Sequence, residues 1–258
     1  MLTFARVLNK YVESIINLKN KTIMKKIMMI AAMMVATVSA NAQFEAGTFS
    51  LQPKLGVGVS WLSNMPDLPL GQALVETGVA SVSRNKVLDK SPIAAASLGV
   101  EAEYQLAPQF SLAAGVNYSL QGGGWKDTDI PVDGEVVKLK DAKIELGYVN
   151  VPVTANLYLF KNFAVKAGVQ FGFLTNASAK CTAEGDGKKV DSDMDMKDDF
   201  ETVNISIPMG ISYQFKTPIV LDLRYNLGLT KVNKDSNPGV KDLKNNMVEL
   251  TVGYKFAL

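Results

Sequence analysis

The chain has 258 residues, of which 47% are hydrophobic and 20% are charged, and this composition excludes an intrinsically disordered or collagen-like protein. It contains no histidine and a single cysteine, which excludes Ser-His and Cys-His nucleophile pairs, disulfide frameworks and multi-cysteine zinc sites. The whole chain has a net charge of +2, but residues 43–258 hold 21 basic and 24 acidic side chains, a net charge of −3, so we expect no nucleic-acid partner.

The first predicted element is a secretory signal peptide at residues 24–42. Two lysines follow Met24, an apolar run occupies residues 27–38, and an Ala-x-Ala ending precedes Gln43. The apolar run is too short to cross a bilayer as a stable helix, and we expect cleavage directly before Gln43. Residues 1–23 have no place in such a signal, so translation is expected to start at Met24. The alternative is a genuine amphipathic extension.

The rest of the chain, residues 43–258, is predicted to form one β-domain, because apolar and polar residues alternate with period two through most of it. The alternation is clearest in residues 219–230, where large apolar side chains share one face and polar side chains or glycine share the other. The same pattern predicts eight strands in all, at residues 49–62, 94–106, 110–122, 143–160, 163–178, 202–216, 219–230 and 247–257.

The connections between these strands alternate in length. Three of them are tight turns, at residues 107–109, 161–162 and 216–218. The others are long, polar and rich in Asp, Lys, Gly and Asn, at residues 64–93, 123–142, 179–201 and 231–246. This rhythm is typical of short periplasmic turns and long extracellular loops. The predicted fold is therefore all-β: an eight-stranded antiparallel up-and-down transmembrane β-barrel.

The orientation of the two strand faces follows from side-chain volume. The interior of an eight-stranded barrel is only just filled by side chains, so the face that carries most of the large apolar residues does not fit inside. The face with small and polar residues must line the lumen, and lipid must cover the apolar exterior. We therefore expect the protein in the cell outer membrane, with outer-membrane lipid as a partner and with aromatic girdles at the strand ends. A soluble, lipocalin-like binding barrel is the alternative.

Four stretches resemble the PorT-like outer-membrane β-barrel family of Gram-negative bacteria. They are residues 147–153 (Gly-Tyr-Val-Asn-Val-Pro-Val), 163–168 (Phe-Ala-Val-Lys-Ala-Gly), 224–229 (Arg-Tyr-Asn-Leu-Gly-Leu) and 253–256 (Gly-Tyr-Lys-Phe). The resemblance spans essentially residues 43–258. It implies an outer-membrane barrel and, for a few members of the family, a role in assembling a protein-secretion system. Ala257 and Leu258 depart from the family pattern, because they follow the aromatic residue that usually ends such chains.

The predicted lumen contains four basic and four acidic side chains, namely Lys54, Lys166, Arg224 and Lys255 against Glu101, Glu103, Asp222 and Glu249. Isolated charges in a narrow interior would be costly, so this balanced set predicts a hydrogen-bonded ion-pair network that plugs the barrel. We expect Arg224 at its centre, bridging two carboxylates. A proton or substrate relay is the alternative.

Three other features suggest sites only at first sight. The acidic run at residues 191–199 alternates carboxylates but lacks the glycine and the glutamate of an EF-hand loop, so it predicts a solvated loop. Residues 122–124 are three glycines without a following Lys-Ser, which predicts a flexible rim and not a phosphate-binding loop. Cys181 lies near the same rim, and we expect this lone thiol to be incidental and not catalytic. We predict no catalytic residue, metal site or cofactor.

The sequence therefore favours a non-enzymatic outer-membrane barrel of structural or interaction type, with a plugged, non-conducting lumen. An outer-membrane hydrolase or acyltransferase would usually need a histidine-assisted nucleophile. The alternative is an accessory component of a protein-secretion system that docks to envelope or secretion-system proteins. A small porin is a further, less favoured reading.

Overall fold

A computed structural model describes residues 45–66, 88–132, 135–185, 188–234 and 241–258. The predicted start-site extension and signal peptide, residues 1–42, lie outside the described residues. Within the described part of the chain, no helical segment has both the length and the hydrophobicity needed to cross a membrane.

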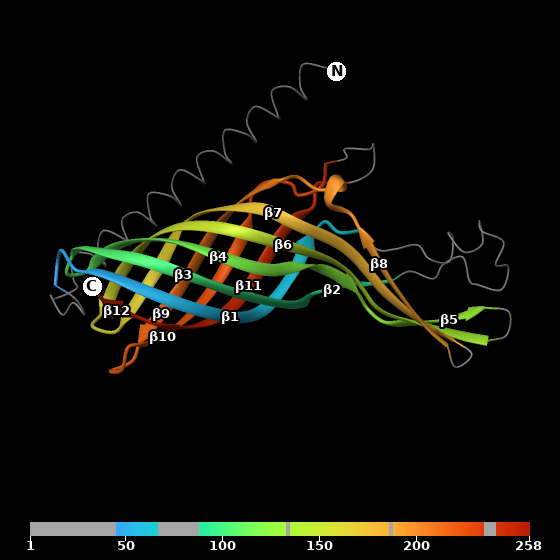
Figure 1. Cartoon of the computed structure of the whole chain (residues 1–258), viewed down its shortest axis with the longest axis horizontal. Coiled ribbons are helices and arrows are strands. Elements are labelled where there is room, and N and C mark those ends of the chain that lie inside the picture. Colours follow the sequence, from blue (N-terminus) through green and yellow to red (C-terminus); the bar gives the residue numbers. More distant parts are fainter. Residues whose placement is uncertain (1–44, 67–87, 133–134, 186–187, 235–240) are drawn as a thin grey trace, which may run out of the picture.

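Eight long strands form a closed ring. They are β1 (Phe49–Ser63), β3 (Ile93–Ala107), β4 (Phe110–Trp125), β6 (Glu135–Phe160), β7 (Phe163–Gly185), β9 (Val203–Gln214), β10 (Ile219–Gly228) and β11 (Lys244–Tyr254). Each pairs antiparallel with the next, and β11 pairs with β1 to close the ring. The structure confirms the predicted eight-stranded up-and-down barrel (Figure 1).

The tight turns gather at one end of the barrel. The β3–β4, β6–β7 and β9–β10 hairpins turn there, and the short strand β12 (Phe256–Ala257) pairs with the beginning of β1 at the same end. The backbone N–H of Leu258 donates to the carbonyl of Phe49, which ties the C-terminus to β1 at 2.9 Å. In outer-membrane barrels the short turns face the periplasm, so we call this the periplasmic end.

Two segments predicted as loops are strands instead. Residues 123–142 contribute the end of β4, the strand β5 (Thr128–Val132) and the beginning of β6. Residues 179–201 contribute the end of β7, the strand β8 (Lys188–Asp195) and the 3-10 helix η1 (Lys197–Asp199). Strands β5, β6, β7 and β8 pair in this order into a sheet that projects beyond the barrel (Figure 1). We call it the extracellular sheet. Most of its described residues are exposed or only partly buried, so the alternation that marks a barrel strand is weak there.

Of the other two predicted loops, residues 64–93 include the two-residue strand β2 (Lys90–Ser91), which pairs with the end of β4, and residues 231–246 include the beginning of β11. The glycines at 122–124 also belong to β4 and not to a loop rim. Gly122 has φ of +143°, which glycine adopts without strain, and its N–H donates to Oγ of Ser60 at 2.8 Å. A Cβ at position 122 would also lie 2.0 Å from the carbonyl oxygen of Ile144, so this position of the barrel wall requires glycine.

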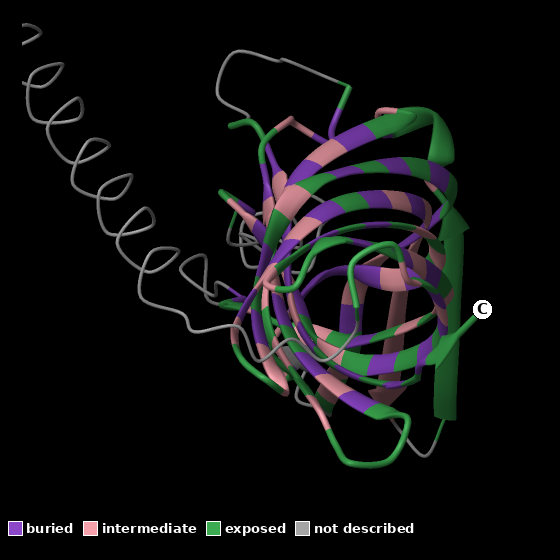
Figure 2. Ribbon diagram, turned by 90° about the vertical axis from the view of Figure 1, so that its left-hand side faces the viewer, coloured by how far each residue is buried: buried purple, intermediate pink, exposed green. Residues whose placement is uncertain are grey.

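Burial alternates along every barrel strand, as the banded ribbon in Figure 2 shows. On β1, Lys54 is 6% exposed while its neighbour Leu55 is 63% exposed. Large apolar side chains on the outer face of the other strands are exposed in the same way. No described protein surface covers this band, which is the property expected of a surface in contact with lipid.

Aromatic side chains pair at the periplasmic ends of the strands. The ring centroids of Phe160 and Phe163 are 6.3 Å apart, and those of Tyr213 and Phe215 are 5.1 Å apart. Toward the other rim, Trp61 stacks on Tyr225 at 6.0 Å. Aromatic rings at these two levels are typical of the interfacial girdles of membrane barrels.

Candidate functional site

All eight charged residues predicted for the lumen lie inside the barrel. Each occupies an inward position of its strand or, for Lys255, the residue that follows β11, and none is more than 6% exposed. The structure brings seven of the eight into ion pairs within the described residues. The eighth, Glu249, accepts a hydrogen bond from Oγ of Ser97 at 2.8 Å.

Glu101, and not Arg224, is the centre of the larger cluster. Lys54 on β1 binds one of its oxygens, Lys166 on β7 binds the other at 2.8 Å, and the guanidinium of Arg224 lies 3.2 Å from Oε2. The prediction that Arg224 bridges two carboxylates is therefore wrong. Arg224 is paired in register with Glu249 on β11, but its guanidinium crosses the lumen to β3.

Lys166 extends this cluster to a second carboxylate. Its ammonium group lies 3.4 Å from Oδ1 of Asp222. The other oxygen of Asp222 accepts longer hydrogen bonds from Gln52 at 3.5 Å and from Thr251 at 3.4 Å. Side chains from β1, β3, β7, β10 and β11 are thus joined through one network across the lumen. We call these linked groups the Glu101 network.

A second cluster surrounds Glu103, nearer the periplasmic end. Lys255 lies 2.9 Å from Oε2 of Glu103, and the Tyr158 hydroxyl and Oγ of Ser111 both donate to Oε1. Lys255 also donates to the Tyr158 hydroxyl at 3.1 Å. Tyr158 and Ser111 were not predicted as lumen residues, because the prediction considered charged side chains alone. Period two could have identified them, since Tyr158 shares the inward face of β6 with Asn156, and Ser111 shares the inward face of β4 with Ala113.

The other end of the lumen contains a cluster of large apolar side chains, which corrects the prediction of a small and polar lining throughout. Inward side chains of β1, β6 and β7 pack there against side chains from the segments that follow η1 and β10. We call this group the apolar cap; its buried members are Leu62, Met65, Leu146, Tyr148, Leu174, Ala177, Phe200, Val232 and Leu243.

Backbone hydrogen bonds hold the loop residues of the cap in place. The N–H of Glu201 donates to the carbonyl of Val232 at 2.7 Å, and the N–H of Val232 donates to the carbonyl of Leu243 at 2.8 Å. Phe200 also forms an isolated antiparallel bridge with Asn233. The loop segments thus fold over the extracellular end of the lumen, an arrangement that strand periodicity does not predict.

The extracellular sheet carries charges on its surface. Lys140 donates to Glu184 at 2.7 Å, and Lys180 donates to Glu145 at 2.9 Å. The hydrogen bond and the charge of Lys140 hold the pKa of Glu184 below its usual value, and those of Glu184 raise the pKa of Lys140. Both pairs are partly exposed, so their effect on stability is small.

The acidic run predicted as a loop forms most of β8 and η1. The Asp191 carboxylate accepts a hydrogen bond from Oγ1 of Thr182 at 2.7 Å, which lowers its pKa. Among the described residues, no group of three or more potential ligands is arranged to hold a metal ion. Cys181 lies on β7 as a partly buried free thiol.

A family model described as outer membrane protein beta-barrel domain matches residues 41–234 of the chain. No curated protein matches the sequence. Among solved structures, the chain is similar to Neisserial surface protein A, with 14% identity and a TM-score of 0.39 over 81% of this chain and 97% of that one. It is also similar to Ail, the attachment invasion locus protein of Yersinia pestis, in complex with sucrose octasulfate, with 11% identity and a TM-score of 0.36 over 83% and 100% of the two chains.

Proposed function

Because this chain belongs to the family of outer membrane protein beta-barrel domains, we propose that it serves in the outer membrane as a structural or interaction barrel with a closed, non-conducting lumen. The observation that carries the proposal is the filling of the lumen at two levels. The Glu101 network joins opposite walls of the barrel, and the apolar cap covers the extracellular end. An eight-stranded barrel has room for little more than its own side chains.

The extracellular sheet supports the interaction part of the proposal. It places the exposed strand β8 and the ends of β6 and β7 beyond the barrel rim (Figure 1). Its surface includes the exposed apolar side chains of Val190 and Met194 beside charged ones. A projecting sheet with an exposed strand of this kind is suited to contact a partner outside the membrane. The complete absence of histidine supports a role without catalysis.

Planar-bilayer recording of the purified, folded protein tests the closed lumen. We expect no steady single-channel conductance from the wild type. A matched measurement on Glu101→Gln, which removes the central charge and keeps the side-chain shape, is expected to show raised leak or brief openings because three cations lose their common partner. Steady, large conductance of the wild type would overturn the proposal.

A narrower candidate is an accessory component of a protein-secretion system, as the resemblance to the PorT-like family implies. Three of the stretches that carry the resemblance contribute Lys166, Arg224 and Lys255, which all take part in the lumen clusters. Cross-linking in intact envelopes, with the cross-linker placed on β8, tests it. Capture of secretion-system proteins would favour this candidate, and their absence would leave the structural or interaction barrel as the better account.

A further inference from the structure

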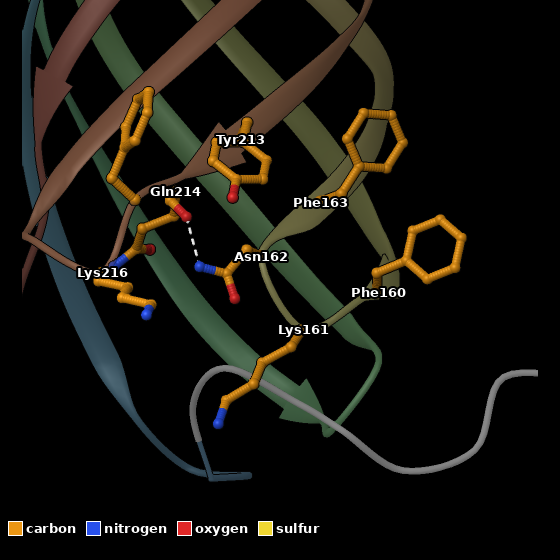
Figure 3. A pocket seen from close by; sticks show the side chains of 8 residues that line it. Phe160, Lys161, Asn162, Phe163, Tyr213, Gln214 and Lys216 are labelled. Atoms are coloured by element: carbon orange, nitrogen blue, oxygen red, sulfur yellow. Dashed lines mark hydrogen bonds between the residues drawn. The ribbon is translucent and has the colours of Figure 1, made fainter.

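The periplasmic end carries an open groove between two neighbouring turns. The groove has a volume of about 910 Å³ and lies between the β6–β7 and β9–β10 turns. Its described lining residues are Phe160, Lys161, Asn162, Phe163, Tyr213, Gln214, Phe215 and Lys216 (Figure 3). None of them is acidic.

Hydrogen bonds fix the two walls of the groove relative to each other. The N–H of Gln214 donates to the carbonyl of Asn162 at 2.8 Å, and Nδ2 of Asn162 donates back to the carbonyl of Gln214 at 2.6 Å. Figure 3 shows the second of these bonds between the two turns. The groove is therefore built into the barrel and does not have to form when a ligand arrives.

The groove has an apolar part and a cationic part. The two aromatic pairs, Phe160 with Phe163 and Tyr213 with Phe215, lie on the lipid-facing ends of the strands, and Phe160 is 71% exposed. Lys161 and Lys216 extend from the turns themselves (Figure 3). Neither lysine has an ion pair, hydrogen bond or ring contact with any other residue in the part of the chain that the structure describes.

We propose that this groove binds one anionic phospholipid of the periplasmic leaflet. The two lysines match a negatively charged headgroup at the membrane surface, and the aromatic pairs match the beginning of the acyl chains below it. A soluble anion would use only the lysines, and a neutral lipid would use only the rings. The joint presence of both parts in a preformed groove favours an anionic lipid over either.

Lipid exchange in mixed nanodiscs tests the proposal. The protein is reconstituted with phosphatidylcholine and phosphatidylglycerol, and native mass spectrometry counts the lipids retained by the released barrel. We expect the wild type to retain phosphatidylglycerol preferentially. Each of Lys161→Gln and Lys216→Gln should lower this preference about fivefold, since one lysine near an anionic surface contributes roughly that factor.

The matched control is the double variant Lys188→Gln and Lys189→Gln on the extracellular sheet. It removes two positive charges, as the Lys161/Lys216 double variant does, but far from the groove. This control should keep the wild-type preference. Added glycerol phosphate, which carries the headgroup charge without acyl chains, should not displace the retained lipid. Heat-modifiability on gels verifies that every variant is folded. An unchanged preference in the Lys161/Lys216 double variant, or displacement by glycerol phosphate, would overturn the lipid site.

Discussion

The ammonium group of Lys166 on β7 lies 2.8 Å from Oε1 of Glu101 on β3, and the contact joins two walls of the barrel that are not neighbours in the ring. Lys54 and Arg224 bind the same carboxylate from β1 and β10. One buried anion thus compensates three buried cations, which makes it the residue on which the network depends most.

We therefore expect Glu101→Ala to be the most damaging single change in the lumen. Removal of one partner of a buried ion pair costs about 3–5 kcal/mol, because the remaining charge is left without compensation. The temperature at which the compact band disappears in heat-modifiability gels measures the loss. Asp193→Ala on the exposed strand β8 is the control and should melt with the wild type. Equal melting of Glu101→Ala and the wild type would show that the network does not stabilise the barrel.

Arg224→Ala should be harmful but less so than Glu101→Ala, because Glu101 keeps Lys54 and Lys166 as partners. A hydrogen bond to a charged group contributes about 1.5–3 kcal/mol. The Glu101→Ala and Arg224→Ala double variant closes a mutant cycle, and a coupling energy above about 0.5 kcal/mol is expected for residues in direct contact. Urea unfolding in lipid vesicles gives the four free energies. Additive losses would contradict the contact.

The strand order was predictable because each barrel strand buries one face and exposes the other to lipid, which imposes period two on the sequence. The pairing of Ile219–Gly228 between its two neighbours follows directly from this pattern. The extracellular sheet was not predictable in the same way. Residues such as Lys138 and Lys140 alternate with Leu139. Because neither face of this segment packs against a large hydrophobic core, the alternation is weak and the sequence resembles that of a polar loop.

The composition of the lumen network was predictable from inward charges, but its geometry was not. Which cation reaches Glu101 depends on the width of the ring and on the stagger of strands that are not neighbours. From the sequence, Arg224 lies two residues from Asp222 on one strand and Glu249 lies on the neighbouring strand, whereas the fold brings the Arg224 guanidinium to Glu101. The apolar cap was missed because Phe200 and Val232 lie in connections, where a single apolar residue carries no periodic signal.

The apolar cap predicts a further stability effect. Phe200→Ala should destabilise the protein by about 3–5 kcal/mol, because a buried aromatic ring leaves a cavity that the surrounding side chains fill only in part. Leu55→Ala is the control, since its side chain is on the lipid-facing surface and not in the cap. Thermal loss of the compact band compares the two variants. A larger effect of Leu55→Ala would contradict a packed cap at Phe200.

Phe200→Ala should also make the extracellular end of the lumen accessible. A cysteine introduced as Leu62→Cys belongs to the same buried cluster as Phe200, and native Cys181 is first replaced by serine to leave one thiol. Labelling by a membrane-impermeant maleimide should be slow in the Leu62→Cys protein and faster when Phe200→Ala is added. Equal rates in both proteins would mean that Phe200 does not close this end.

The pair of Lys140 and Glu184 predicts a local pH dependence in the extracellular sheet. The Lys140 ammonium group lowers the pKa of Glu184 in the folded protein, so the pair's contribution is present above the ordinary glutamate pKa. It is lost as the pH falls through the lower folded pKa, when the carboxylate takes up a proton. Lys140→Gln should return the pKa of Glu184 to its ordinary range, whereas Lys126→Gln, which removes the ion-pair partner of Asp89, should leave it unchanged. NMR titration of the Glu184 side-chain carboxyl measures the pKa in both variants. If the pKa of Glu184 in the Lys140→Gln protein equals that in the wild type, the hydrogen bond between the two residues is absent in solution.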